Sequence, residues 1–497
     1  MHRDDRRKWL EAGINSMASH AKFCRGMGFA VVGLLAGCAS PPRYATPPPA
    51  ARCGPDAAVI AFTSSPREPA SEGSDSRPPA PLPLVTPVSY QSAAAMPAAS
   101  SDADEPFLGQ TELSAQQLAA EVQRRNPSLW AATAAWRAAA QRYPQMVSLD
   151  DPMFAFMIGP GGVGQMDGGG WMVEASQKLP WAGKRALRGV AADAEADAMR
   201  GQIGDTRLQL TLAAKMALLD YYLARRQAEV NVATAALLKQ FREIAKTKYE
   251  VNQATEQDVL QADVELAGLD SRRTQLTRDE QVAAARINTL LHLEPGHRLP
   301  PPPGHVPMPE ALPDVQMLQE TAEHTRPDLF SQAARIRAEQ ANLDLACKEY
   351  WPDPEVAFKY DAFMPDDMRA QVGMSLNVPI RLARRSAAIR EAAERLQQRR
   401  AEYQDRLDQV RFEVQSAYDS ASQGQQVVRL YREKILPAVQ RNFESAQANY
   451  IAGKIDFLRL IDAERQLYSQ REMYYQAQAD YHRRLAELER AAGEPLP

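Results

Sequence analysis

The sequence predicts an α+β membrane protein built from a duplicated unit of long antiparallel coiled-coil helices and two strand pairs. Three observations predict this class. Landmark residues recur in the same order about 200 residues apart, as an internal duplication produces. Apolar residues follow three-four spacing over long stretches, which is typical of coiled-coil helices. Short segments between these stretches alternate apolar and polar residues, which is typical of strands with one apolar and one wet face.

The duplication depends on four pairs of landmarks in the same order. They are Asn126-Pro127 with Arg326-Pro327, Asp151-Pro152 with Asp353-Pro354, Leu179-Pro180 with Val378-Pro379, and the set Tyr249, Ala262 and Leu266 with Tyr450, Ala463 and Leu467. One pair could be chance, but the ordered set indicates two copies of one unit. We therefore expect a first repeat over residues 109–299, a proline-rich strap over 300–314 and a second repeat over 315–497.

The N-terminal region predicts a lipoprotein. The apolar run from Gly28 to Gly37 is too short to span a membrane as a helix, which needs ~20 residues, so residues 1–37 are expected to be a signal peptide. Leu35-Ala36-Gly37-Cys38 matches a bacterial lipobox, which predicts lipidation of Cys38. Residues before Met17 do not resemble the start of such a signal, which suggests that translation begins downstream of Met1. Residues 38–108, rich in Pro, Ala and Ser, are expected to form a disordered tether.

Each repeat is expected to hold a helical hairpin. No proline occurs between Trp181 and Glu294, and an apolar seam sustained over ~65 residues predicts a rod of roughly 100 Å. The seam residues in this stretch are Leu212, Met216, Leu219, Leu223, Val230, Ala233, Leu237, Phe241 and Ile244. The chain is expected to turn at Val251-Asn252-Gln253 and at Ala452-Gly453-Lys454, because Asn and Gly tolerate positive φ.

Strand segments lie between the landmarks and the helices. Val173 to Leu179 alternates apolar and polar residues, and so do the runs 355–360 and 371–378. A soluble half-buried sheet would give the same pattern. Four strands of about ten residues per chain could instead span a membrane, but they could close a barrel only if several chains contributed. A trimer sharing about twelve strands would leave no sheet edge unpaired.

The composition excludes several classes of function. Lys and Arg number 58 against 62 Asp and Glu, for a net charge of −4, and both signs are interspersed, so nucleic acid is not an expected partner. No nucleophile, phosphate loop or metal-ligand motif occurs, so the chain is not expected to be an enzyme, to carry catalytic residues or to bind a cofactor. His292, His297 and His305 surround the proline-rich strap, where surface histidines are the simpler interpretation than a metal site.

These motifs together resemble the outer-membrane efflux proteins similar to TolC, also called outer-membrane factors. The resemblance covers residues 113–493 and rests on the duplication, Asn126-Pro127, the two Asp-Pro steps, the run from Leu179 to Arg185, and the two tip turns. It implies a homotrimer whose β-barrel lies in the outer membrane and whose α-helical tunnel extends into the periplasm. It also implies a periplasmic adaptor and an inner-membrane pump as partners.

The resemblance also assigns roles to residues near the two turns. Tyr249, Asn252, Asp258, Tyr450 and Gly453 match the family's periplasmic tip positions, which contact the adaptor, although the family usually has glycine where Asn252 stands. Asp462 matches the position of a pore constriction, where three copies would form a cation-attracting ring. A solvated helix carboxylate is the plainer interpretation of Asp462.

The sequence alone does not decide the cargo or exclude two alternative functions. Methionines near the strands could bind soft metal ions, although packing is a commoner role for Met, and the segment after Leu179 resembles ducts of heavy-metal efflux systems, so heavy-metal cations are the expected cargo. The alternatives are a periplasmic adaptor lipoprotein, which would need one hairpin between two β halves, and a coiled-coil envelope scaffold, which would not need the alternating strands.

Overall fold

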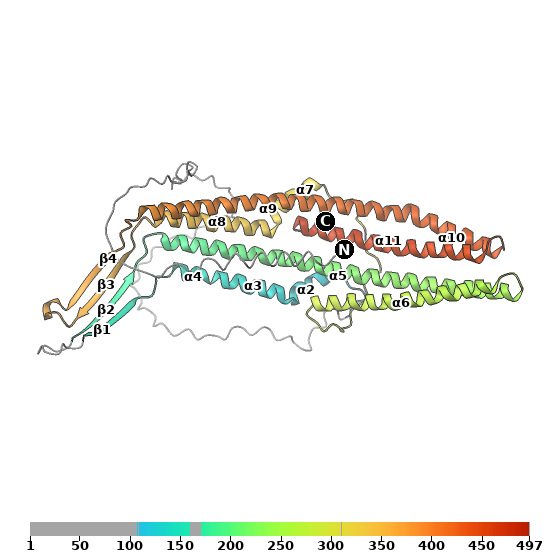
Figure 1. Ribbon diagram of the computed structural model, residues 1–497, viewed down its shortest axis with the longest axis horizontal. Coiled ribbons are helices and arrows are strands. Elements are labelled where there is room, and N and C mark those ends of the chain that lie inside the picture. The colour runs from blue at the N-terminus through green and yellow to red at the C-terminus, as the bar shows by residue number, and fades with distance from the viewer. Residues whose placement is uncertain (1–106, 108, 160–169, 310, 497) are drawn as a thin grey trace, which may run out of the picture. The chain divides into compact units, whose positions relative to one another are not determined.

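A computed structural model describes residue 107 and residues 109–159, 170–309 and 311–496 of the chain. The predicted signal peptide, Cys38, the tether and most of the loop between the first two strands lie outside these described residues. The four-stranded sheet lies at one end of the long helices, and the hairpin turns lie at the opposite end (Figure 1). All the predicted site residues other than Cys38 lie at or near the two hairpin turns.

The duplication is visible in the order of the elements. In the first copy, α2 (Ala115–Arg125), α3 (Pro127–Ala140) and α4 (Arg142–Val147) precede the strands β1 (Met153–Gly159) and β2 (Gly170–Lys178), which are followed by α5 (Lys184–Glu250) and α6 (Glu256–Leu290). In the second copy, α7 (Val315–Thr325) and α8 (Pro327–Lys348) precede β3 (Pro354–Asp361), the short turn η1 (Asp366–Met368) and β4 (Ala370–Leu376). The second hairpin follows, as α9 (Leu382–Leu430), the π-helical turn η2 (Tyr431–Ile435), α10 (Leu436–Ile451) and α11 (Phe457–Ala492).

The landmark residues act as local signals for helix starts and strand ends. Asn126 caps α3 by accepting a hydrogen bond from the Ser128 amide, and Pro127 occupies the first turn of that helix, where its fixed φ and missing N–H are tolerated. Pro327 holds the same place in α8. The strands are seven to nine residues long, shorter than expected, because β2 and β4 end just before Leu179-Pro180 and Val378-Pro379, and proline has no N–H for the sheet.

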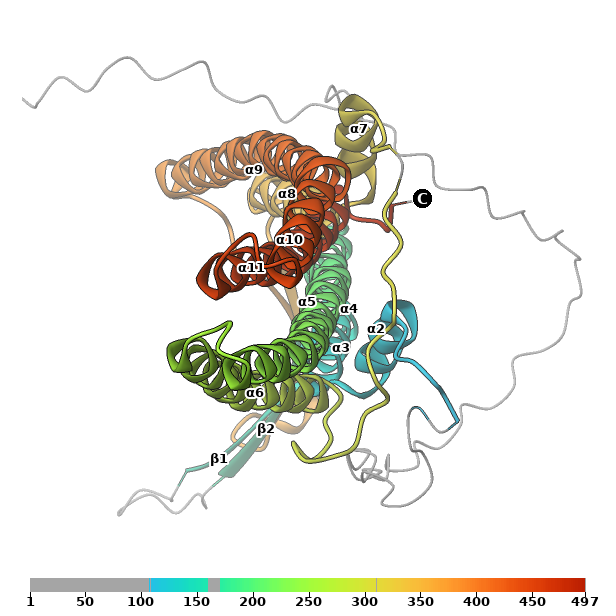
Figure 2. The same ribbon diagram turned by 90° about the vertical axis from the view of Figure 1, so that its right-hand side faces the viewer.

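The helices pack side by side in a fixed order. α9 contacts α8, α8 contacts α5, and α5 contacts α6; viewed along the helices, α9 and α6 lie at the two ends of this curved row (Figure 2). α11 lies against both α9 and α5. Each chain therefore has two helices, α6 and α9, that form the borders of the row.

The buried face of α5 corrects the expected apolar seam. Leu219, Val230 and Phe241 are buried as predicted, but the buried positions elsewhere are offset from the predicted ones, as at Leu238 in place of Leu237. Many of the buried side chains of α5 are alanines, such as Ala214 and Ala217. α5 packs against helices on several sides, so small residues let the neighbouring backbones approach where a single leucine seam would not.

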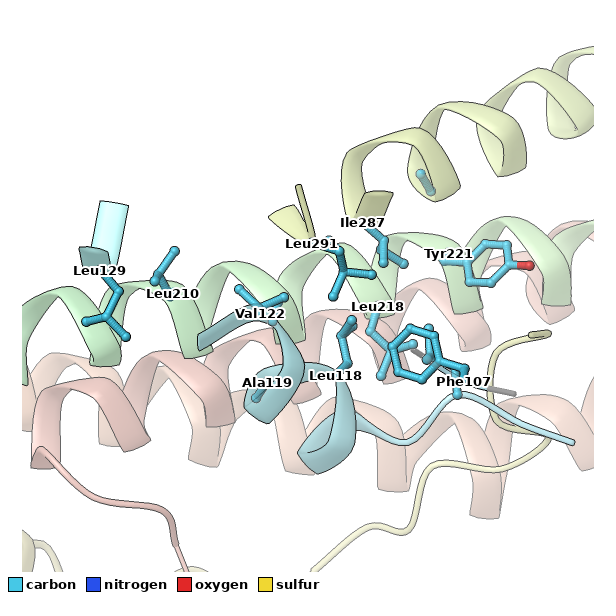
Figure 3. Packing of buried hydrophobic residues seen from close by; sticks show 14 residues of the cluster. Phe107, Leu118, Ala119, Val122, Leu129, Leu210, Leu218, Tyr221, Ile287 and Leu291 are labelled. Atoms are coloured by element: carbon cyan, nitrogen blue, oxygen red, sulfur yellow. The ribbon is translucent and has the colours of Figure 1, made fainter. Parts of the chain in front are cut away.

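Hydrophobic clusters hold the short helices against the long ones. In the first copy, Leu118 and Val122 of α2 pack against Leu218 of α5 and Ile287 near the end of α6, as Figure 3 shows. In the second copy, residues of α7, α9 and α11 form the equivalent cluster, which includes Leu318, Val414 and Leu488. A third cluster lies toward the helical turns and draws on both hairpins.

Candidate functional site

Two regions of the structure are relevant to function: the hairpin turns and the sheet. The two hairpin turns, called the tips below, carry Tyr249, Asn252, Asp258, Tyr450 and Gly453, with Asp462 in the second turn of α11. The sheet lies at the other end of the helices (Figure 1).

The two tips have the same backbone hydrogen bonds. In the first, the Asn252 amide donates to the Tyr249 carbonyl at 2.9 Å and the Gln253 amide to the Lys248 carbonyl at 2.7 Å. In the second, Gly453 donates to Tyr450 at 3.1 Å, and the following Lys454 amide donates to the Asn449 carbonyl at 2.9 Å.

This pattern is a Schellman motif, which needs a left-handed residue at its centre. Asn252 has φ 60° and Gly453 has φ 73°, so the predicted turn positions are confirmed. Asparagine adopts this conformation at some cost, and glycine adopts it without a Cβ penalty.

The returning helices start with different caps. Thr255 and Asp258 form a capping box at the start of α6, in which the Thr255 amide donates to Asp258 Oδ2 at 3.2 Å. At the start of α11, Asp456 accepts from the Arg459 amide at 3.1 Å. Asp258 therefore has a structural role in the tip, since a capping box satisfies two helix donors that would otherwise lack a partner.

The equivalent residues Tyr249 and Tyr450 occupy opposite environments. Tyr249 is 45% exposed, whereas Tyr450 is 4% exposed and lies against Phe457 with ring centroids 5.5 Å apart. Lys248 of the first hairpin lies 4.1 Å from the Tyr450 ring centroid and donates to the Tyr450 carbonyl at 2.5 Å. Burial, followed by the charge of Asp258, raises the pKa of Tyr450 to about 12. Tyr450 thus joins the two tips, and Tyr249 is the tyrosine that a partner could reach.

Asp462 is exposed on α11 and has a partner within the chain. Its Oδ1 lies 3.4 Å from Arg465 Nη1, and its side chain is 61% exposed. Arg465 also pairs with Glu265 of α6, and this hydrogen bond lowers the pKa of Glu265. Asp462 is therefore part of a charged group that includes residues of both returning helices.

Glu464 is a feature of the tip region that the sequence analysis missed. Its side chain is 4% exposed, and burial, followed by the charge of Glu265, raises its pKa to about 7, against the opposing charges of Arg465 and Arg471. The sequence contained a signal, because Glu464 lies four residues after Leu460 and three before Leu467, within an apolar seam. An acidic residue at such a position is costly when ionised.

The register of the sheet separates an apolar face from a polar one. Cross-strand partners such as Ala175 and Phe358, or Phe358 and Val372, point to the same side of the sheet. On one side lie Phe154, Phe156, Ile158, Trp171, Val173, Ala175, Val356, Phe358, Tyr360, Val372, Met374 and Leu376, with Gln177 as a polar residue among them. On the other side lie Glu174, Ser176, Lys178, Glu355, Lys359, Gln371 and Ser375, together with Met153, Met157 and Met172.

The apolar face is open, and neither border strand has a partner on its outer side among the described residues. Phe154 is 76% exposed, Val372 79% and Met374 68%. The strand order is β1-β2-β3-β4, antiparallel throughout, so within the described part of the chain β1 and β4 each have a neighbour on one side only. Such unpaired edges and such exposed apolar area are a liability for an isolated chain in water.

Aromatic pairs mark both ends of the sheet. Trp171 and Tyr360 stack with centroids 5.1 Å apart on the apolar face, and Trp181 and Trp351 stack at 5.1 Å where the sheet meets the helices. At that junction, Lys184 is 1% exposed and its Nζ lies 2.9 Å from Asp353 Oδ1, which also accepts from the Trp181 amide at 2.7 Å. This buried pair fixes the start of α5 against the start of β3.

Within the residues that the structure describes, none of the helices combines the length and the apolar composition that a transmembrane helix requires. Nor do three or more His, Cys, Asp or Glu side chains gather there in a way that could hold a metal ion.

Comparisons with known proteins agree with this architecture. Residues 318–494 match a family described as "Outer membrane efflux protein". No curated protein matches the chain in sequence.

Three solved structures have the same fold. The outer-membrane channel OprN has a TM-score of 0.67 at 21% identity, over 78% of this chain and 94% of its own. CusC has a TM-score of 0.66 at 17% identity, over 79% of this chain and 96% of its own. The outer membrane protein VceC of Vibrio cholerae has a TM-score of 0.64 at 18% identity, over 77% of this chain and 97% of its own. The predicted fold class of long antiparallel helices with strand pairs is thereby confirmed.

Proposed function

We propose that this chain is an outer membrane efflux protein and forms, as a homotrimer, the outer-membrane exit duct of a tripartite efflux system. In this proposal the chain acts as a channel and not as an enzyme; the partial match to the family described as "Outer membrane efflux protein" supports it. The observation that carries the proposal is the sheet, which has one apolar face, one polar face and two unpaired edges. Lipid on one side and water on the other would suit these two faces.

Closure by three copies explains the unpaired edges. One chain supplies four strands, which is too few for a barrel with a water-filled interior, whereas three chains supply about twelve. Joining β4 of one copy to β1 of the next would pair every edge. The same closure would place α9 of one copy beside α6 of the next, since these helices form the borders of the helix row.

The aromatic pairs give the sheet a suitable height for a membrane. The interval from Trp171 to Trp181 is ten residues, at most about 34 Å at ~3.4 Å per residue. A strand tilt of ~40° reduces this to about 26 Å, close to the ~25 Å apolar band between the aromatic girdles of outer-membrane barrels. The Trp181–Trp351 pair would then mark the periplasmic boundary, and the helices would extend into the periplasm.

The tips would form the periplasmic entrance. Exposed Tyr249 and the turn residues Asn252 and Gly453 are the candidate contacts for a periplasmic adaptor, while Asp258 and buried Tyr450 would support the turns from within. Asp462, exposed on α11, would contribute to a constriction around the threefold axis. Energy for transport would come from an inner-membrane pump that acts through the adaptor.

A lipid on Cys38 would anchor the chain to the outer membrane. This part of the proposal rests on the lipobox Leu35-Ala36-Gly37-Cys38. Incorporation of labelled palmitate in cells tests it, with Cys38→Ser as the comparison. Label that persists in Cys38→Ser would contradict this anchor site.

Heavy-metal cations are the proposed cargo. The register places Met153, Met157 and Met172 on the polar face of the sheet, with Met157 directly opposite Met172. Thioether sulfur binds soft cations such as Cu(I) in preference to hard ones. Cells that lack their own copper or silver efflux would be expected to gain silver resistance when this chain is expressed with its adaptor and pump. No gain over cells expressing the adaptor and pump alone would count against this cargo.

The decisive test of the duct is the mass of the detergent-extracted protein together with its single-channel conductance in planar bilayers. We expect a trimer with small, cation-selective conductance that increases in Asp462→Ala. A conducting trimer in which that variant changes nothing would remove Asp462 from the constriction. A monomer without conductance would contradict the barrel and favour the adaptor lipoprotein or the envelope scaffold.

A further inference from the structure

The two free borders of the sheet carry opposite charges at the end nearest the helices. The start of β1 pairs with the end of β2, through Met153 and Ser176. The end of β2 lies beside the start of β3, and Pro354 of β3 pairs with Leu376, the last residue of β4. Residues just before β1 and just after β4 therefore lie at the same end of the sheet.

The acidic border is formed by Asp150 and Asp151, directly before β1. Both are exposed, and neither side chain accepts a hydrogen bond or forms an ion pair among the described contacts. The basic border is formed by Arg381, five residues after the end of β4 and next to the start of α9, and by Arg384 in the first turn of α9. Both are also exposed and likewise have no ion-pair or hydrogen-bond partner in the described part of the chain, whereas neighbouring Arg385 donates to the Glu349 carbonyl at 2.6 Å.

These opposite charges cannot pair across the sheet of a single chain. β1 and β4 are separated by β2 and β3, so three strand spacings of ~4.8 Å put the borders about 14 Å apart. Between copies the distance is different. If β4 of one copy pairs with β1 of the next, the two strand ends lie about one strand spacing apart, so the segment after β4 and the segment before β1 run side by side.

We propose that Arg381 and Arg384 of one copy form ion pairs with Asp150 and Asp151 of the next, and so join the sheet borders at the base of the shared barrel. This inference rests on the proposed trimer. The partner is a second copy of this chain because charge complementarity and the unpaired strand edges coincide at the same two borders. Opposite charges at the two borders would also favour joining β4 to β1 over joining like borders.

A charge swap tests the proposal. Three variants of the full-length chain are purified in detergent: Asp150→Lys with Asp151→Lys, Arg381→Glu with Arg384→Glu, and all four changes together. Native mass spectrometry over a dilution series measures the trimer fraction. Asp367→Lys, an exposed acid at the other end of the sheet, is the control, and circular dichroism checks that every variant keeps its helix content.

Each single-border variant should raise the protein concentration below which the trimer dissociates, because its association constant should be about tenfold smaller than that of the unmodified chain. The four-residue swap should restore it, because the charges are again complementary. The control should match the unmodified chain.

Several outcomes would overturn the inference. It fails if the swap does not restore the trimer, or if the single-border variants match the control while the unmodified chain is trimeric. It also fails if only the arginine variant has an effect and only when anionic phospholipid is present, which would make the arginines lipid contacts. If the unmodified chain is itself monomeric, the proposed duct fails first.

Discussion

In the first hairpin α5 runs without interruption for 67 residues, whereas the equivalent stretch of the second hairpin is divided by the π-helical turn Tyr431–Ile435. Pro437 follows that turn within the first residues of α10. A proline lacks the helical N–H and its ring clashes with the carbonyl four residues earlier, here that of Glu433, so the wider turn accommodates it. The copies therefore share a plan but differ in how regular their long helix is.

The two hairpins also differ in which side chains they bury. Tyr450 is inside the tip and its equivalent Tyr249 is exposed. Glu464 is buried, whereas its equivalent Asp263 forms an ion pair with Arg242 at 2.6 Å. The two tips thus share the backbone of the turn and differ in their side chains.

Replacing Tyr450 and Tyr249 in turn should show the largest difference in stability between the two tips. Tyr450→Ala removes a buried ring that contacts Phe457 and Lys248, and large-to-small changes of this kind cost about 3–5 kcal/mol. Tyr249→Ala should change stability by less than about 0.5 kcal/mol, since the residue is exposed. Hydrogen exchange of the tip amides in the detergent-extracted protein measures both. Equal effects at the two positions would contradict the assigned difference in burial.

Tyr450→Phe is the matched control for the ring. The Tyr450 hydroxyl is buried without a hydrogen-bond partner, and a buried hydroxyl that lacks a partner costs free energy. We therefore expect Tyr450→Phe to leave the tips unchanged or slightly more protected from exchange. A loss as large as that of Tyr450→Ala would mean that the hydroxyl, and not the ring, stabilises the tip.

The second prediction concerns pH. The pKa of Glu464 in the folded state, about 7, exceeds its ordinary value of 4.5, so the folded state holds this proton more tightly than the unfolded state. The carboxyl imposes no penalty below about pH 4.5; the penalty grows as pH rises from there to about 7 and is complete above that. At 1.36 kcal/mol per pKa unit it is on the order of 3 kcal/mol.

The tip amides of the second hairpin should therefore exchange faster at pH 8 than at pH 5, after correction for the intrinsic pH dependence of exchange. Glu464→Gln, which is neutral at both values, should remove this difference and slow exchange at pH 8. Asp263→Asn in the first hairpin is the control and should lack this stabilising effect, because Asp263 already has Arg242 as a partner. A pH response that survives in Glu464→Gln would assign it to another group.

How far the sequence could predict these features depends on whether they are local. The positive-φ turn positions, the helix start at Asn126 and the alternation along β2, β3 and β4 follow from neighbouring residues, and the structure confirms them. The difference between Tyr249 and Tyr450 was not predictable in the same way, because it depends on how one hairpin packs against the other. Nor was the alanine-rich face of α5, since burial there reflects several neighbouring helices at once.

The smallest expected effect on stability comes from replacing the positive-φ residues of the two turns, Gly453 and Asn252. Gly453 has φ 73° and no heavy atom within 4 Å of the place where a Cβ would lie, so Gly453→Ala adds backbone strain without a clash. A cost of about 1 kcal/mol is expected. Asn252 already carries a side chain in the same conformation, so Asn252→Gly should change stability by no more than about 0.5 kcal/mol. Exchange of the Gln253 and Lys454 amides, which close the two turns, measures each effect separately. If Gly453→Ala had no effect on the Lys454 amide, the turn would be held by the packing of Tyr450 and Phe457 and not by its backbone.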